Sequence, residues 1–361
     1  MSVLSTYLSD PFLHKLYSQV RNAGSLRSIS LDLTHDCNLR CDGCYYFEEG
    51  MDKIAMNNSH LDVAFHELVR NELKRGTNFV TVVGGEPSLR LDRLKIIYDN
   101  FKMNVATNGL TKIPFEGFEN MPIGVSVWGD HQTDAKFRNK GKKDLFKIAL
   151  YNFKDDPRAF FYYTVTHDKS EEIESVVEQC INNGNKVLFN YYSDLRIDHR
   201  GQIRDFENVR LEIDRMIDRY PENILTTSYF NEVITKGKIQ DQHWSYEVCT
   251  NVSTNYKKNE TRIRNGNPYN KHFRSYNADF KTTRRCCTGI DRSCDSCFDA
   301  WEHFSWIMIN MKMHLSSKQK FIHWLTTMYM FYYINGLLEK SENEGIVAEI
   351  HKLLQPKKIA L

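Results

Sequence analysis

Three cysteines stand close together near the start of the chain, in the segment Thr34–Tyr46, which reads THDCNLRCDGCYY. Because only three and two residues separate Cys37, Cys41 and Cys44, a folded loop cannot hold their thiols far apart. Thiolates are soft ligands that suit iron–sulfur clusters or zinc. A structural zinc site usually takes four ligands, commonly from two paired sets. The compact trio therefore favours a four-iron cluster with one iron open to a chelating molecule, and zinc or incidental clustering are the alternatives.

A second cysteine group lies in the segment Arg284–Trp301, which reads RRCCTGIDRSCDSCFDAW. Five thiols compete for one four-ligand site there, and they are Cys249, Cys286, Cys287, Cys294 and Cys297. A second iron–sulfur cluster is the preferred interpretation, with a structural zinc site or unligated cysteines as alternatives. We expect the adjacent pair to contribute a single ligand, because neighbouring side chains diverge. Arg284 and Arg285 are expected to form an exposed basic turn, with compensation of the negative charge of a thiolate cluster or binding of an anionic substrate as alternatives.

Short β-rich runs alternate with amphipathic stretches between residues 28 and 192. The helical stretches include Leu61–Arg75 and Ser170–Asn182, where apolar residues recur at helical spacing. Strands that alternate with helices predict a parallel sheet built from βαβ units, with its active site at the carboxyl ends of the strands. The expected strands are Ser28–Leu33, Asn78–Val83, Asn104–Thr107, Ile123–Trp128, Phe160–Thr166 and Val187–Tyr192.

The residues that could do chemistry follow the ends of these strands. Cys37 follows the first strand, the run Gly84–Pro87 the second and Thr107–Gly109 the third, while Ser126 lies late in the fourth. Two adjacent glycines let the backbone approach a ligand closely, and the carboxylate of Glu86 can bind an ammonium group. Each glycine-containing run could, by itself, be an ordinary turn.

Together and in this order, the four segments resemble the radical S-adenosylmethionine (SAM) superfamily. The resemblance covers about residues 25–200 and implies a partial (β/α)6 barrel. It also implies that Cys37, Cys41 and Cys44 hold a [4Fe–4S] cluster. The positions that match SAM contacts of that superfamily are Gly84, Gly85, Glu86, Pro87, Thr107, Asn108 and Ser126.

The position before the third cysteine departs from the superfamily pattern. This position is often aromatic and packs near the adenine of SAM, whereas here it is Gly43. Tyr45 or Tyr46 could supply the missing aromatic surface.

The resemblance implies a reaction class. Such enzymes reductively cleave SAM to methionine and a 5′-deoxyadenosyl radical, which abstracts a hydrogen atom from an organic substrate. An oxidoreductase or transferase supplied with electrons by a flavodoxin or ferredoxin is therefore expected.

The short segment before the barrel favours a small-molecule substrate, as in a natural-product-like pathway. The second cysteine group loosely resembles the SPASM and twitch auxiliary-cluster extensions, which makes peptide or protein modification the alternative. A zinc-stabilised binding module is the non-enzymatic alternative.

Composition sets the remaining bounds. Lys and Arg (48) nearly balance Asp and Glu (46), which gives no electrostatic case for a nucleic-acid partner. The first residues lack the apolar run of a signal peptide, and Phe321–Leu338 is too short and too polar for a membrane span. We therefore expect a cytoplasmic chain without membrane contact, where clustered cysteines indicate metal ligation. Its expected parts are a helical lead-in (1–24), the barrel (25–200) and a mostly helical, cysteine-containing extension (201–361).

Overall fold

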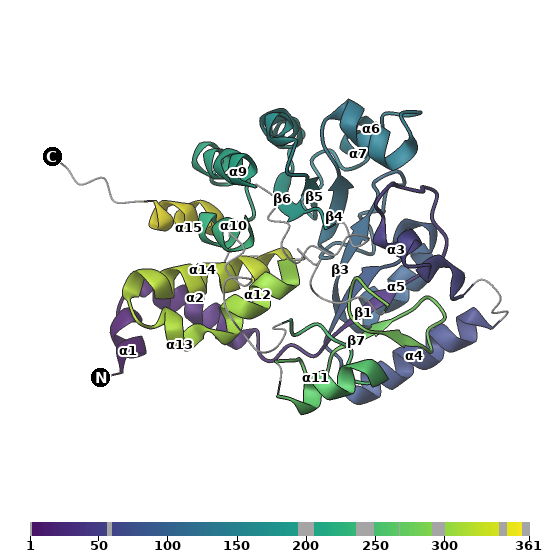
Figure 1. Cartoon of the computed structure of the whole chain (residues 1–361), viewed down its shortest axis with the longest axis horizontal. Coiled ribbons are helices and arrows are strands. Elements are labelled where there is room, and N and C mark those ends of the chain that lie inside the picture. Colours follow the sequence, from purple (N-terminus) through teal and green to yellow (C-terminus); the bar gives the residue numbers. More distant parts are fainter. Residues whose placement is uncertain are drawn as a thin grey trace.

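A mostly parallel sheet forms the centre of the molecule (Figure 1). The computed structural model describes residues 2–55, 60–193, 206–235, 249–266, 268–290, 300–338 and 345–355. Within these ranges the sheet has eight strands in the order β6-β5-β4-β3-β2-β1-β7-β8, and only the β7–β8 pair is antiparallel. The strands are β1 (Ser28–Asp32), β2 (Phe79–Val83), β3 (Lys102–Thr107), β4 (Ile123–Val127), β5 (Ala159–Val165), β6 (Lys186–Tyr191), β7 (Arg274–Tyr276) and β8 (Thr283–Arg284).

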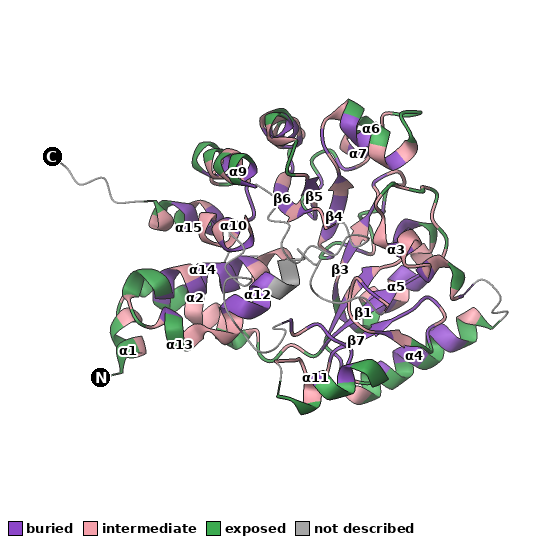
Figure 2. Cartoon of the chain, in the orientation of Figure 1, coloured by how far each residue is buried: buried purple, intermediate pink, exposed green. Residues whose placement is uncertain are grey.

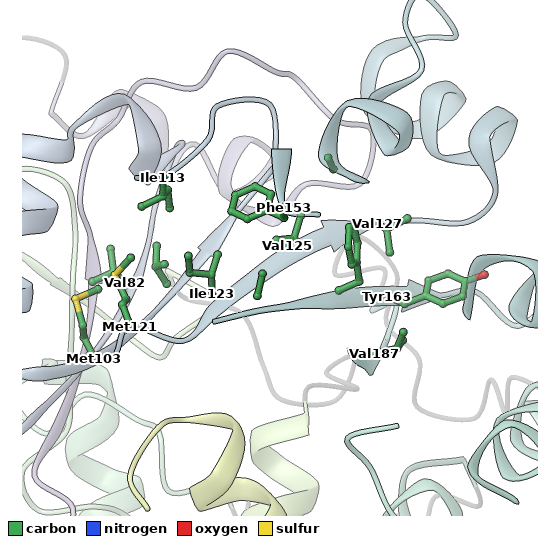
Figure 3. Packing of buried hydrophobic residues seen from close by; sticks show 14 of the residues in the cluster. Val82, Met103, Ile113, Met121, Ile123, Val125, Val127, Phe153, Tyr163 and Val187 are labelled. Carbon is green, nitrogen blue, oxygen red and sulfur yellow. The ribbon is translucent and has the colours of Figure 1, made fainter. Parts of the chain in front are cut away.

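Helices that connect the strands cover the outer face of this sheet. Two of the connecting helices, α3 (Tyr45–Glu48) and α6 (His131–Asn139), contribute residues to a cavity at the carboxyl ends of the strands. The helices on the outer face are α4 (Leu61–Arg75), α5 (Leu91–Asn100), α7 (Leu145–Asn152) and α8 (Ile173–Asn182). Alternate side chains of each strand point outward and are buried beneath them, as Met103 and Val125 show (Figure 3). Because side chains alternate between faces, Asn104 and Ala106 of β3 face the inside of the curved sheet and are less buried.

A second, helical layer joins the two ends of the chain. Its helices are α1 (Val3–Tyr7), α2 (Pro11–Asn22), α9 (Glu207–Arg219), α10 (Ser228–Thr235), α12 (Ala300–Ile309), α13 (Met311–His314), α14 (Lys318–Ile334) and α15 (Ile346–Leu354), while α11 (Glu260–Arg264) lies below the sheet (Figure 1). Leu13 and Leu16 of α2 are fully buried against Phe321 and Leu325 of α14, so the lead-in packs on the C-terminal helices (Figure 2). In the part of the chain that the structure describes, no helix combines the length and apolarity needed to cross a bilayer.

The expected α/β fold with a helical extension is confirmed, and each of the six predicted strands begins and ends within two residues of its observed position. The predicted number of strands was wrong, because β7 and β8 lengthen the sheet beyond β1. Both come from the polar region after residue 250, where no apolar alternation marks a strand. The division of the chain near residue 200 stays a prediction, although β7 shows that the C-terminal part contributes to the same sheet.

A buried carboxylate fixes β7 to the helices of the barrel. Glu72 of α4 is 0% exposed. It accepts hydrogen bonds from Tyr276 Oη at 2.7 Å, from Arg75 Nε at 3.1 Å and from the hydroxyl of Thr77. Arg75 also donates to the carbonyl oxygen of His272 at 2.8 Å. The region just before β7 is therefore attached to α4 by charge-assisted bonds that are shielded from water.

We expect Glu72→Ala to lower the free energy of unfolding by about 3–5 kcal/mol, because it leaves the Arg75 cation and two hydroxyls without their buried acceptor. Urea denaturation of the anaerobically prepared protein measures this value. Glu67→Ala, at an exposed position of the same helix, is the matched control and should change it by less than about 0.5 kcal/mol. Equal effects of the two substitutions would contradict the assigned role of Glu72.

Candidate functional site

The three N-terminal cysteines line one cavity at the carboxyl ends of the strands. Cys37, Cys41 and Cys44 are unpaired and partly buried, and the cavity that they line has a volume of about 410 Å³. Burial raises the pKa of Cys37 and of Cys41 to about 11, and it also raises the pKa of Cys44. The fold therefore keeps three thiols on one wall, partly shielded from water.

The chemistry of this donor set fits an iron–sulfur cluster. Cys37, Cys41 and Cys44 all line the same cavity. Thiolates are the usual protein ligands of such clusters, and each one binds a separate iron. The residues present therefore fit a [4Fe–4S] cluster bound by Cys37, Cys41 and Cys44.

The two glycines of the run Gly84–Pro87 pack against the cysteine loop. A Cβ atom on Gly85 would lie 2.0 Å from the carbonyl oxygen of Asp36, which is closer than any side chain can approach. The amide of Gly85 donates to Thr34 O at 2.9 Å, and that of Glu86 donates to Asp36 O at 2.7 Å. Gly84 has φ of +113°, and a Cβ atom on it would lie 2.9 Å from the Cα of Asp32. The glycines thus let the two loops meet, backbone against backbone.

Glu86 connects this loop to the end of β3. Its side chain is buried at 1% exposure and accepts hydrogen bonds from Thr107 Oγ1 at 2.6 Å, Asn108 N at 2.7 Å and Ser88 N at 2.9 Å. The carboxylate that we expected to bind an ammonium group is therefore already well supplied with donors from the protein.

The remaining positions that match SAM contacts divide into two groups. Ser126 and Asn108 line the cavity. The side-chain amide nitrogen of Asn108 donates to Asn38 Oδ1 at 2.7 Å and lies 4.0 Å from the sulfur of Cys37. Pro87 is buried and is not among the residues that line the cavity. It begins a short 3₁₀ turn, Pro87–Leu89, which a fixed φ favours.

An aromatic ring fills the space left by Gly43. A Cβ atom on Gly43 would lie 2.4 Å from the hydroxyl oxygen of Tyr192, which follows β6. The Tyr192 ring also packs 5.4 Å from the ring of Trp128, centroid to centroid. Tyr45 and Tyr46 line the same cavity, but Tyr46 is only 2% exposed and donates to Thr34 O at 3.2 Å. Tyr192 is thus a further aromatic residue that the cysteine spacing alone does not indicate.

Arg138 of α6 is the main residue that sequence reasoning missed. Its guanidinium is 1% exposed and donates to Ser126 O at 2.8 Å and to Asn108 O at 2.5 Å. It pairs with the carboxylate of Asp134 at 3.1 Å, and its positive charge lies close enough to the Cys41 thiol to lower the pKa of that thiol against the effect of burial. One buried cation therefore joins the cysteine loop to the ends of β3 and β4. The i, i+4 spacing of Asp134 and Arg138 was the only signal in the sequence.

The second cysteine group is partly described. Cys287 lines the same cavity as the first trio, while Cys294 and Cys297 lie outside the described residues. Cys249 is 7% exposed, three residues before Val252, which pairs with Cys286 in an antiparallel bridge. Contact with the Cys287 thiol lowers the pKa of Cys286 to about 6, assisted by the amides of Thr288 and Gly289. That the adjacent pair contributes a single ligand stays a prediction.

The exposed basic turn expected at Arg284 is wrong. Arg284 is 0% exposed and forms a buried ion pair with Asp32, at the end of β1, in which its Nη2 donates to Asp32 Oδ1 at 2.9 Å. It further donates to the carbonyl oxygens of Cys286 at 3.2 Å and Cys287 at 3.1 Å. A buried cation cannot stay unpaired, so this arginine places the second cysteine loop beside the first.

A parallel sheet with a thiolate trio and glycine loops at its carboxyl edge defines a class of SAM-binding iron–sulfur enzymes, and comparison with known proteins agrees. GTP 3′,8-cyclase of Staphylococcus saprophyticus is 25% identical over 270 residues, which cover 66% of this chain and 75% of that protein. The sporulation killing factor maturation protein SkfB of Bacillus subtilis is 26% identical over 170 residues, 44% of this chain and 40% of that protein. No family model matches the chain.

Solved structures with a similar arrangement include anSMEcpe with bound AdoMet and a peptide, with a TM-score of 0.47 and 14% identity over 91% of this chain and 99% of that one. Streptococcus suis SuiB bound to its precursor peptide SuiA has a TM-score of 0.44 and 15% identity over 63% of this chain. The chain spans about half of SuiB, 55% of its length.

In sequence the chain is similar to radical SAM enzymes. It is a SAM-dependent enzyme whose cofactors are a [4Fe–4S] cluster and SAM.

We expect Arg138→Met to shift the midpoint potential of the reconstituted cluster to more negative values, by about 60 mV, the equivalent of a tenfold change for one electron. The reason is that a buried cation beside a cluster ligand stabilises the reduced, more negative state. Potentiometry followed by electron paramagnetic resonance measures this shift. Arg138→Lys, which keeps the charge, should recover most of it, and Arg90→Met, which removes a cation outside the cavity, is the control. A purely structural role would lower iron content in both Arg138 variants and leave the potential of the bound cluster unchanged.

Proposed function

We propose that this enzyme uses its N-terminal cluster to cleave SAM reductively and modifies an organic substrate held in the same cavity. When bound, the cluster supplies one electron that splits SAM into methionine and a 5′-deoxyadenosyl radical, which then abstracts hydrogen from the substrate. The observation that carries the proposal is that the cysteine trio, the glycine run Gly84–Gly85, Asn108 and Ser126 line one cavity.

The residues of the chain divide the work of holding SAM. Cys37, Cys41 and Cys44 hold the cluster. The backbone of Gly84 and Gly85 lines the cavity, and its polar groups would form hydrogen bonds with the methionine end of SAM. The Glu86 carboxylate accepts hydrogen bonds from Thr107 and Asn108. Its main role is therefore to fix the position of the Gly84–Gly85 backbone.

We assign the adenine end of SAM to the ring of Tyr192. This ring lies against Gly43 beside the third cysteine and packs on Trp128, and both aromatic residues line the cavity. Aromatic rings bind bases by stacking without a specific hydrogen-bond pattern. Tyr45 and Tyr46 remain the alternatives, and the buried hydroxyl bond of Tyr46 favours Tyr192.

A small organic molecule, which would share this cavity with SAM, is the proposed substrate. Peptide modification is the second proposal, and the name of SkfB, a maturation protein, supports it. We also propose that the second cysteine group holds an auxiliary iron–sulfur cluster and that a ferredoxin or flavodoxin donates the electrons. The auxiliary site is supported by Cys287, whose position on the shared cavity brings that group beside the substrate.

Anaerobic reconstitution followed by dithionite and SAM tests the central proposal. Wild-type protein should form 5′-deoxyadenosine, detected by liquid chromatography. Cys41→Ala should abolish it, because the cluster loses one of three ligands. Cys180→Ala is the matched control, since Cys180 is fully buried in the core cluster away from the cavity, and it should keep the activity. Colourless protein containing stoichiometric zinc would contradict the proposal and favour the binding module.

Iron counting separates the two cysteine groups. A variant in which Cys37, Cys41 and Cys44 are all replaced by Ala should retain about half of the wild-type iron if the second group holds a cluster of the same size. Loss of all iron from this variant would contradict the proposal that the second cysteine group holds an auxiliary cluster.

Replacing the proposed adenine platform should weaken SAM binding. We expect Tyr192→Ala to raise the Kd of SAM about tenfold, because base–aromatic stacking contributes about 1–3 kcal/mol. Tyr192→Phe should bind nearly as well as wild type, since it keeps the ring. Tyr151→Ala, at a position 83% exposed, is the control. Equilibrium dialysis of the reconstituted protein gives the Kd of SAM for each of the three variants. An unchanged Kd for Tyr192→Ala would show that adenine does not stack on Tyr192.

A further inference from the structure

The cavity continues from the cysteine loops down the inside of the sheet. Strand pairing places Ser30, Thr81 and Asn104 side by side in one layer. Two residues farther along the strands, towards the cysteines, Gly124 pairs with Ala106 and Phe160. All of these side chains or their backbones line the cavity. Small residues on β1 to β4 therefore leave open a lower chamber, which we define as the part of the cavity lined by these two layers and by the helices that face them.

The C-terminal helices close the open side and the floor of this chamber. The sheet ends at β6, and α10, α12 and α14 lie on that side (Figure 1). Lys186 of β6 donates to Tyr333 Oη of α14 at 2.9 Å. At the floor, Asn104 Nδ2 donates to Asn335 Oδ1 at 2.6 Å. The chamber is thus enclosed by regions that are far apart in the sequence, since these two hydrogen bonds join residues 147 and 231 positions apart.

The walls contributed by these helices are apolar and aromatic. They include Phe304 of α12 and Phe331 of α14, whose rings stack with centroids 3.9 Å apart. Phe230 of α10, Met330 and Ile334 of α14 and Leu188 of β6 add to this side, and the neutral hydroxyl of Thr327 lies among the lining residues of α14. Opposite them stand the neutral hydroxyls of Ser30 and Thr81.

In the described lining of the cavity, the fixed charges lie at the cysteine end. Among the described residues that line it, the ionic side chains other than thiols and phenols are Glu86 and Arg138. Both lie at the loops beside the cysteines, and both are bonded to protein groups. The described lining of the lower chamber holds no Lys, Arg, Asp or Glu. A phosphate or carboxylate would lose its water there without a cation to replace it.

We infer that the lower chamber binds an uncharged, largely apolar group, such as an aromatic ring, and excludes phosphorylated substrates. This inference rests on the proposed function, since it names the chemical class of the substrate. The group can be a free molecule or an aromatic side chain of a peptide, because both present the same surface to the walls.

Binding of indole to the reconstituted protein, followed by ligand-observed NMR, tests the inference. We expect indole to bind with a Kd below about 1 mM, and GTP, a triphosphate, not to compete with it. Ala106→Phe should weaken indole binding at least about tenfold by filling the chamber, a loss of about 1.4 kcal/mol. Leu211→Phe, on an outer face of α9 where Leu211 is 53% exposed, is the matched control and should bind like wild type. The iron content and melting temperature of each variant show whether it is folded.

A second substitution keeps the test decisive if Ala106→Phe does not fold. Ile334→Lys introduces an ammonium group at a partly exposed position of the chamber wall and should likewise weaken indole at least about tenfold. N-acetylphenylalanine amide and a capped Gly-Phe-Gly peptide, used as competitors, distinguish a free molecule from a peptide side chain. Absence of indole binding to wild type, or its displacement by GTP, would overturn the inference. Formation of 5′-deoxyadenosine is measured separately, so protein that cleaves SAM but binds no indole refutes this inference alone, whereas protein that binds indole but never cleaves SAM refutes the proposed function.

Discussion

The backbone contact between the cysteine loop and the glycine run is the constraint on which the rest of the site depends. Any side chain at position 85 would overlap the carbonyl of Asp36, since its Cβ would lie 2.0 Å away. The two amide–carbonyl bonds at 2.9 and 2.7 Å form only at this separation. Glu86 then extends the arrangement to β3 through Thr107 and Asn108. A single carboxylate and two glycines therefore determine where the thiols stand relative to the sheet.

The C-terminal extension is part of this arrangement. Arg284 reaches from β8 to Asp32 and fixes the backbone of the second cysteine pair. Burying an ion pair is costly unless the remaining donors are also bonded, and here they are bonded to carbonyl oxygens of the cysteine loop. The Arg284–Asp32 ion pair therefore serves mainly to place the second cysteine loop beside the first strand, and it adds little to the free energy of unfolding.

Sequence pattern was enough to predict the strands and the cysteine loop, because both have local signals: β-rich runs and cysteine spacing. It was not enough for β7, a three-residue strand, Arg274–Tyr276, whose place depends on the distant carboxylate of Glu72. Arg138 was missed for a similar reason, since its partner Cys41 lies 97 residues earlier and no local motif connects them. Tyr192 became visible only when the fold brought the end of β6 against Gly43. Residues whose role arises from long-range contact have no periodicity or spacing that would mark them.

The two ends of the cavity are lined by different parts of the chain. The end beside the cysteines is built from strand-end loops whose polar groups are bonded to one another, which suits a charged cosubstrate. The lower chamber takes its character from α10, α12 and α14, where Phe230, Phe304 and Phe331 supply apolar surface. Because these helices make none of the hydrogen bonds described above for the cysteine, glycine and Asn108 loops, changes in their side chains can alter the chamber while leaving that end intact. Under the proposed function, the barrel carries the chemistry, and the strands of the barrel and the helices that close it together line the chamber for the substrate.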